Sequence, residues 1–101
     1  MSATPVDAYV LETLMPDLVG HDRSPSAFLV YLHLWHRTAG SRERRSARSL
    51  AQVAEDTGLS KSAVQGALRV LKRRKLVRAE RASLTAVPVY EVLRPWVRNG
   101  R

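Results

Sequence analysis

The feature that most constrains the fold is residues 49–77, which read SLAQVAEDTGLSKSAVQGALRVLKRRKLV. Ser49 and Ser60 each stand where a hydroxyl can accept from the free amides of a first helical turn, and Gln52 can complete a capping box at Ser49. Gly58 lies between these two starts and supplies the positive φ that commonly ends a helix. The pattern therefore predicts two short helices joined by a tight turn.

The second predicted helix is amphipathic. Its apolar residues recur at i, i+3, i+4 and i+7 and so share one side; they are Val64, Ala67, Leu68 and Leu71, with Ala63 and Val70 widening the arc. The first helix has a matching stripe, and the turn adds one more apolar side chain: Leu50, Val53, Ala54 and Leu59. The two helices can therefore pack as a helix-turn-helix, which leaves the polar side of the second helix where the major groove of a duplex can receive it.

That polar side carries residue types that suit a DNA groove. Gln can pair bidentately with adenine and Arg with guanine, so we predict Gln65 and Arg69 as base readers. Lys61 and Ser62, near the helix N-terminus, are predicted to bind the phosphate backbone and fix the register. Two cations further along the helix complete the predicted contacts: Lys72 and Arg73.

Gly66 lies inside the same helix. A glycine there costs roughly 1 kcal/mol relative to alanine, so it usually reflects a close neighbour. The DNA backbone and the preceding helix explain it equally well from sequence.

Positive charge is concentrated in the second half of the chain. Residues 1–40 hold two Lys or Arg against four Asp or Glu, a net charge of −2, whereas residues 41–101 hold fifteen against five, a net charge of +10. The densest run comprises Lys72, Arg73, Arg74, Lys75, Arg78 and Arg81. A solvated face normally mixes both signs. The charge therefore favours a polyanionic partner, and we expect binding to weaken steeply with salt.

Length and composition set the outer limits. A chain of 101 residues, 45% hydrophobic and 26% charged, is expected to form one globular domain. It has no cysteine and only three histidines, so we expect neither disulfides nor a metal site. No apolar run approaches the ~20 residues of a membrane span and no signal peptide is recognisable, so we expect a cytoplasmic protein, associated with the bacterial nucleoid and without a cofactor.

A further helix is predicted before the motif. Ser24 and Pro25 combine a capping side chain with a residue preset for the first helical position, and the helix should run to about Thr38. It is apolar over most of its circumference, so either the N-terminal residues or a second subunit must cover it. His33 and His36 lie three residues apart on the small polar side of this helix. No third metal ligand is evident, so we interpret them as surface or packing histidines.

The N-terminal segment has enough apolar side chains to cover part of that helix. Thr4 with Pro5 could cap a helix here, but Met15-Pro16 disfavours a continuous one because proline biases its predecessor toward extended geometry. A short strand, or a short helix followed by a separate turn at residues 17–19, fits equally well. We expect the segment to cover the core or, with the apolar helix around residues 28–35, to form a dimer interface.

Residues 40–48 are hydrophilic and basic and are predicted to form a loop. The loop leads directly into the cap of the first motif helix, whose N-terminal amides are suited to an anion. Arg45, Arg48 and Ser49 could therefore contact phosphate there, although a solvated connector explains the loop equally well.

After Leu76 the pattern changes to period two, which predicts a two-stranded hairpin over residues 77–93. Pro88 cannot donate to a ladder, so the second strand should lie at an edge or begin late. Arg78 and Arg81 are the predicted contacts of this hairpin with the minor groove or the flanking backbone.

The order helix, helix, turn, helix and hairpin resembles the winged helix-turn-helix superfamily of bacterial DNA-binding proteins over roughly residues 24–93. The resemblance is carried by Ser49-Leu50-Ala51, Thr57-Gly58-Leu59-Ser60, Ala67-Leu68, Leu71 and Leu76-Val77. It implies a mainly α fold with a small β-hairpin, in which the helix of residues 61–75 enters the major groove and the hairpin of residues 77–93 is the wing. Similar domains mostly bind DNA as homodimers on inverted repeats.

This resemblance divides the chain into three segments. Residues 1–23 are an N-terminal extension, residues 24–93 are the winged domain and residues 94–101 are a basic tail that should fray at its end. Trp96 is expected to fold back on the core. We expect neither a second domain that binds a metabolite nor a small-molecule effector.

These features predict a small transcriptional regulator that binds double-stranded DNA sequence-specifically as a homodimer. A replication or partition module is the alternative within DNA binding. A protein-interaction adaptor is less favoured, because its third helix should be neutral or acidic. An enzyme is not expected, since the sequence shows no nucleophile with a base, no phosphate-cradling glycine loop and no paired carboxylates.

Overall fold

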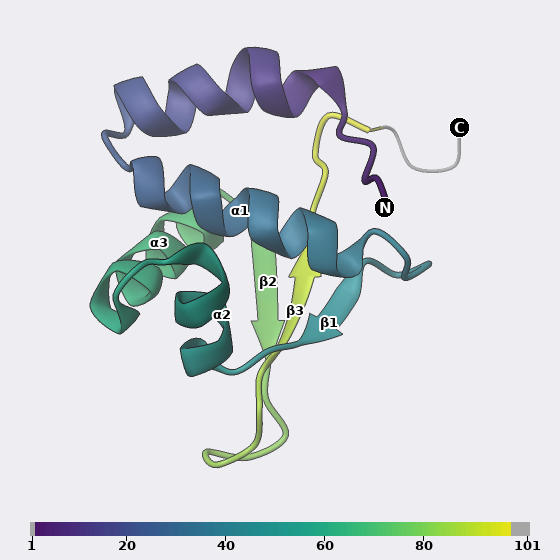
Figure 1. Cartoon of the computed structure of the whole chain (residues 1–101), viewed down its shortest axis with the longest axis vertical. Coiled ribbons are helices and arrows are strands. Elements are labelled where there is room, and N and C mark those ends of the chain that lie inside the picture. Colours follow the sequence, from purple (N-terminus) through teal and green to yellow (C-terminus); the bar gives the residue numbers. More distant parts are fainter. Residues whose placement is uncertain (1, 98–101) are drawn as a thin grey trace.

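The computed structural model describes residues 2–97, in which helices cover one face of a small antiparallel sheet (Figure 1). The elements in chain order are η1 (Val10–Leu14), η2 (Asp17–His21), α1 (Pro25–Thr38), β1 (Arg45–Ala47), α2 (Leu50–Thr57), α3 (Lys61–Arg73), β2 (Val77–Glu80) and β3 (Val89–Val92). This mostly helical architecture confirms the predicted winged helix-turn-helix fold. Among the described residues no helix has the length and apolar character needed to cross a membrane.

Local hydrogen bonds explain why the two motif helices form where the sequence predicts. The Ser49 hydroxyl accepts from the Gln52 amide at 3.1 Å, and the Gln52 side chain accepts from the Ser49 amide at 2.8 Å, so the capping box is complete. Gly58 ends α2 at φ 80°, in the left-handed region. The Ser60 hydroxyl accepts from the amide of Ala63 at 3.1 Å and starts α3. The helix-turn-helix prediction is therefore confirmed.

The hydrophobic core lies between α1, α3 and the sheet. Helix α1 packs more extensively against α3 than against any other element, and its Ser24 cap and its end at Thr38 agree with the prediction. The apolar stripes of the sequence are buried here, including Phe28, Tyr31, Trp35, Val53, Val64, Ala67, Leu68 and Leu71. Most of the apolar side chains of α1 are therefore covered within one chain.

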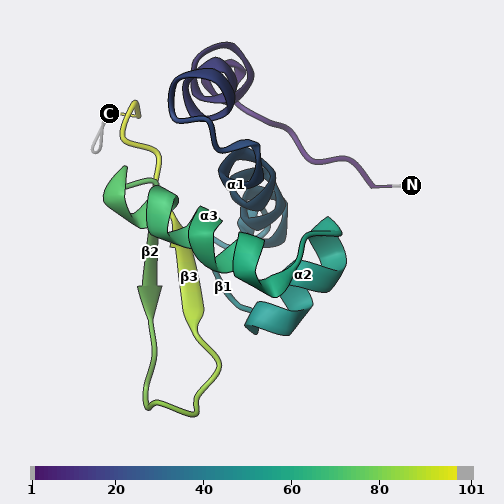
Figure 2. The ribbon, with the colours of Figure 1, turned by 90° about the vertical axis from the view of Figure 1, so that its left-hand side faces the viewer.

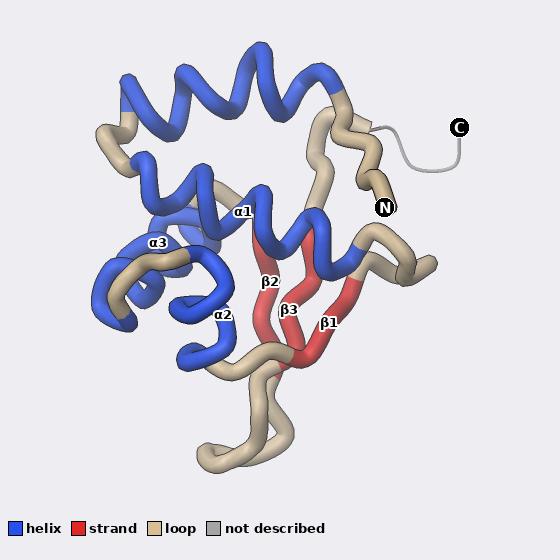
Figure 3. Tube along the Cα trace, in the orientation of Figure 1, coloured by secondary structure: helices blue, strands red, loops and turns tan. Residues whose placement is uncertain are grey.

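The cover of α1 is the N-terminal segment, which is helical from residue 8 to residue 21 and lies along α1 (Figures 1 and 3). Pro16 sits inside this run at φ −65° and ψ −29°. Hydrogen bonds spanning five residues, as from the Met15 amide to the Val10 carbonyl, widen the turns and accommodate the missing proline N–H. Of the alternatives that the sequence left open, the helix forms and the strand does not. The separate turn at residues 17–19 was wrong, because burial of the segment on α1 outweighs the local bias of Pro16.

The sheet has the order β1-β3-β2, with both pairs antiparallel. Strand β1 lies inside residues 40–48, so the sequence-based prediction of a loop throughout this segment is wrong. The residues of β1 are extended because they pair with β3. Arg45 lies opposite Glu91, and the Arg48 amide donates to the Pro88 carbonyl at 3.1 Å. The late start of the second hairpin strand after Pro88 is confirmed, whereas its edge position was wrong because β1 makes β3 the central strand.

The segment after β3 returns to the core as expected. Trp96 stacks on Tyr9 with ring centroids 4.5 Å apart and lies parallel to Trp35 at 6.4 Å. Its indole N–H donates to Asp7 at 3.1 Å. The predicted fraying of residues 98–101 lies outside the described residues.

Candidate nucleic-acid interface

Helix α3 presents one polar face to solvent. Its apolar side is buried against α1 and α2, while Figure 2 shows no other element in front of the helix on its opposite side. All six α3 residues predicted to contact DNA are exposed: Lys61, Ser62, Gln65, Arg69, Lys72 and Arg73. The amphipathic spacing thus turns these side chains together toward solvent.

Ion pairs hold five arginines that lie outside the exposed face of α3. Arg45, Arg48, Arg74, Arg78 and Arg94 all pair with Asp or Glu side chains. By contrast, within residues 2–97 no carboxylate pairs with Lys61, Arg69, Lys72 or Arg73. The acidic residues that form ion pairs therefore neutralise part of the scaffold and leave the cations on the exposed face of α3 uncompensated.

A hollow of about 320 Å³ separates α3 from the hairpin. Gln65, Arg69 and Lys72 line it from α3, and Arg81 lines it from the hairpin. Its apolar wall was not foreseen in the sequence and consists of Leu50, Leu68, Pro88 and Tyr90. The structure thus brings both predicted base readers beside one predicted hairpin contact.

Gly66 has no close protein neighbour. A Cβ built at this position would meet only the Arg69 guanidinium, at 3.7 Å, which is ordinary van der Waals contact. The preceding helix therefore does not account for the glycine, and that alternative was wrong. The reason is that α2 packs against the other side of α3, where Val64 and Ala67 are buried.

Arg48 and Ser49 are occupied within the protein. Arg48 binds Asp56 of α2, and its side chain is only 12% exposed. Asp56 also lies 3.6 Å from Nε2 of His33, and burial lowers the pKa of that histidine while the carboxylate opposes part of the effect. Ser49 is committed to its capping box. This geometry favours a scaffolding role for Arg48, which ties the chain just before α2 to Asp56 in the last turn of that helix.

The cations of the sheet lie on its outer face. Arg78 binds Glu91 at 3.1 Å, and Arg45 binds Glu80 as well as lying 3.8 Å from Glu91. Arg45, Glu91 and Arg78 lie opposite one another across the three strands and alternate in sign. Glu80 lies opposite Val89, and Arg45 reaches it across β3. Arg78 and Arg45 are thus partly neutralised, unlike the cations of α3.

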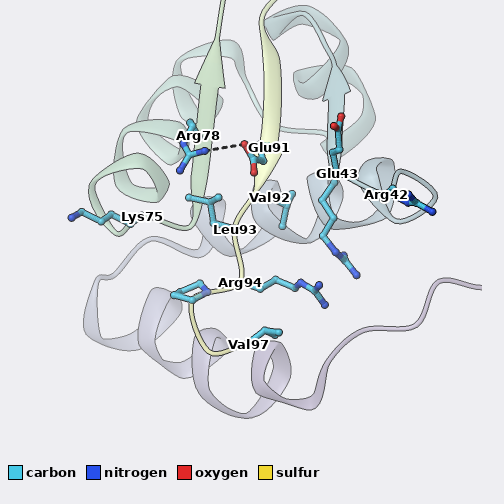
Figure 4. A pocket seen from close by; sticks show the side chains of 11 residues that line it. Arg42, Glu43, Lys75, Arg78, Glu91, Val92, Leu93, Arg94 and Val97 are labelled. Atoms are coloured by element: carbon cyan, nitrogen blue, oxygen red, sulfur yellow. Dashed lines mark hydrogen bonds and ion pairs between the residues drawn. The ribbon is translucent and has the colours of Figure 1, made fainter. Parts of the chain in front are cut away.

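A larger hollow, of about 580 Å³, lies near the outer face of the sheet and the segment after β3 (Figure 4). Figure 4 shows Arg78 reaching Glu91 on its wall, with Lys75, Arg94 and Arg42 nearby. A third hollow, of about 510 Å³, shares Lys75 and Arg78 with it and shares Lys72 with the hollow beside α3. Basic side chains therefore continue from α3 around β2.

No group of three side chains suited to holding a metal ion occurs in the described part of the chain. His33 faces Asp56, and Nδ1 of His36 is hydrogen-bonded to the Thr4 hydroxyl. The two histidines thus have separate packing partners.

The crossed helices α2 and α3, the unneutralised face of α3 and the adjoining hairpin define a winged helix-turn-helix DNA-binding domain. Within this class, residues 41–81 match the model of the IclR helix-turn-helix domain, a span that runs from before β1 through α2 and α3 to the end of β2. The match supports a DNA-binding transcriptional regulator and points away from an enzyme. Neither a curated protein nor a solved structure shows significant similarity to the chain.

Proposed function

We propose that this protein is a sequence-specific regulator whose helix at residues 61–75 enters the major groove of double-stranded DNA, with the hairpin at residues 77–93 as wing. The observation that carries the proposal is the set of four α3 cations without an internal carboxylate partner, beside exposed Gln65. Lys75 and Arg81 adjoin this face and, among the described residues, also lack a carboxylate within ion-pair distance, so they extend the basic surface. Such a surface suits a polyanion with readable base edges.

The side chains of α3 divide into base readers at the middle of the helix and backbone contacts at its two ends. Gln65 and Arg69 lie at the middle of the exposed face, so they are our base readers. Lys61 and Ser62 lie in the first turn, where free amides add favourable interactions with a phosphate. Lys72 and Arg73 extend the backbone contacts at the other end.

We further propose that the protein acts as a homodimer. Of the two parts of the predicted interface, the helix around residues 28–35 is largely buried, so the exposed apolar side chains of the N-terminal segment carry the proposal. Leu11, Met15 and Val19 recur every four residues along that segment and are 37–46% exposed. A two-fold axis through this stripe would present two α3 helices to an inverted repeat.

Selection of bound sequences from a pool of random duplexes at near-physiological salt tests the DNA proposal. We expect a consensus, and an inverted repeat if the dimer forms. Replacing Gln65 and Arg69 together by alanine should abolish the preference while non-specific binding persists, because Lys61 and Lys72 are retained. Arg37→Ala, which removes an exposed cation from α1, is the matched control.

Two outcomes contradict these proposals separately. An unchanged consensus in the double variant would remove the reader assignment. Sedimentation velocity tests the dimer independently, because Met15→Glu should convert it to a monomer. A monomeric wild-type protein that still binds one half-site would refute the dimer alone.

A further inference from the structure

The loop of the hairpin is apolar and carries no charge. Residues 82–90 read ASLTAVPVY, so the nearest charged side chains are Arg81 and Glu91. Leu84 at its tip is 92% exposed and Val87 is 51% exposed. Leu84 is the most exposed large apolar side chain in the described part of the chain. A tip of this kind cannot bind phosphates by charge.

The tip forms hydrogen bonds within its own turn. The Arg81 guanidinium donates to the Leu84 carbonyl at 3.1 Å, and the Ala86 amide donates to the Ser83 carbonyl at 3.2 Å. The hydroxyls of Ser83 and Thr85 lie 3.4 Å apart. Leu84 is therefore presented outward by a tied turn, which lowers the entropic cost of burying it against a partner.

The tip also lies on the side of the molecule where α3 is exposed. Figures 1 and 2 show the loop projecting well beyond the sheet, below α2 and α3. Its root is fixed there, because Arg81 lines the same hollow as Arg69 and Lys72. A duplex seated on α3 would therefore extend past the root of the loop toward Leu84.

We propose that Leu84 is an apolar DNA contact, which enters the minor groove next to the major-groove site and packs against deoxyribose and base edges. This inference rests on the proposed function and adds to it a contact that charge does not provide. Proteins that bind the minor groove often insert an apolar side chain, leucine among them, at a base step and partly unstack it. Arg81 then serves two purposes, because it ties the turn and brings its charge close to the flanking backbone.

The salt dependence of binding separates an apolar contact from a phosphate contact. We expect Leu84→Ala to weaken binding of the selected duplex at least about fivefold, since burial of a leucine side chain is substantial, while the slope of log K against log salt stays unchanged. Lys72→Ala should instead reduce that slope by about 0.9, because one phosphate contact is lost. Leu84→Met should retain most of the affinity.

Leu29→Ala is the matched control, because Leu29 is 45% exposed but lies on α1. It should leave DNA affinity unchanged. A 2-aminopurine base placed at successive positions flanking the consensus should gain fluorescence where Leu84 disturbs stacking, and this gain should vanish in Leu84→Ala.

Three results would overturn the inference. Equal affinity of Leu84→Ala and wild type would show that the tip does not contact DNA, while the role of α3 would stand if the Gln65 and Arg69 variant still lost its preference. A change in the sedimentation coefficient of Leu84→Ala without DNA would assign the tip to a second copy of the chain. Failure of the wild-type protein to bind any duplex would refute the proposed function as well.

Discussion

Arg74, at the C-terminal end of α3, binds Asp17 of η2 with 2.8 Å between Nη2 and Oδ2. Its Nε also lies 3.3 Å from the carboxylate of Asp22, which is only 12% exposed. Arg74 lies in the middle of the most basic run of the chain, yet its role is structural, because it ties α3 to the N-terminal segment that covers α1. Its neighbours Lys72, Arg73 and Lys75 are exposed.

Replacing Arg74 by alanine should therefore affect stability more than DNA binding. We expect the free energy of unfolding to fall by about 1 kcal/mol, since the pairs are partly exposed but involve two carboxylates. Urea denaturation measures this change, and a filter or anisotropy assay measures duplex affinity. Lys72→Ala is the comparison and should show the opposite pattern. A larger loss of affinity in Arg74→Ala than in Lys72→Ala would contradict our assignment.

Gly66→Ala should stabilise the free protein. The added methyl meets no atom closer than 3.7 Å, so the variant gains helix propensity of up to roughly 1 kcal/mol. The same methyl lies on the exposed side of α3, and we expect it to weaken duplex binding severalfold by obstructing a close approach of the DNA backbone. Thermal unfolding and a binding titration check the two effects. A stabilised variant with undiminished affinity would show that Gly66 does not face DNA closely.

Gly58→Ala should destabilise the protein, in contrast to Gly66→Ala. Gly58 has φ 80° and ends α2 in the left-handed region, which costs a residue with a Cβ about 1 kcal/mol. Space is not the cause, because nothing lies within 4 Å of the added Cβ. Gly58→Asn should be milder, since asparagine tolerates this region better. Equal midpoints of urea denaturation for wild type and Gly58→Ala would contradict the expected strain.

His33 should make stability depend on pH. Burial lowers its pKa in the folded protein, whereas in the unfolded chain it titrates near its ordinary value of about 6.5. The stability due to neutral His33 is therefore present above that value and is lost as pH falls through the lowered pKa, because the unfolded chain binds the proton first. Denaturation at pH 7.5 and 5.5 should show a smaller loss for His33→Gln than for wild type. Equal losses would exclude His33 as the cause.

Local signals predicted the motif well because each acts within a few residues. The caps at Ser24, Ser49 and Ser60 and the turn at Gly58 depend on side-chain and backbone groups three or four positions apart. Strand β1 had no such signal, since three polar or small residues become a strand only when β3 lies beside them. The hollow between α3 and the hairpin was missed for the same reason, as its walls are far apart in the chain.

The sequence by itself determined the two capped helices, the apolar faces that pack them and the polar composition of the exposed side of α3, because these depend on short-range hydrogen bonding and helical periodicity. Only the tertiary structure decided which cations stay unpaired and how the N-terminal segment passes Pro16. It also decided where the loop with Leu84 points. Ion pairs such as that of Arg74 with Asp17 join residues distant in sequence, and the burial that keeps Pro16 helical exists only after α1 is in place.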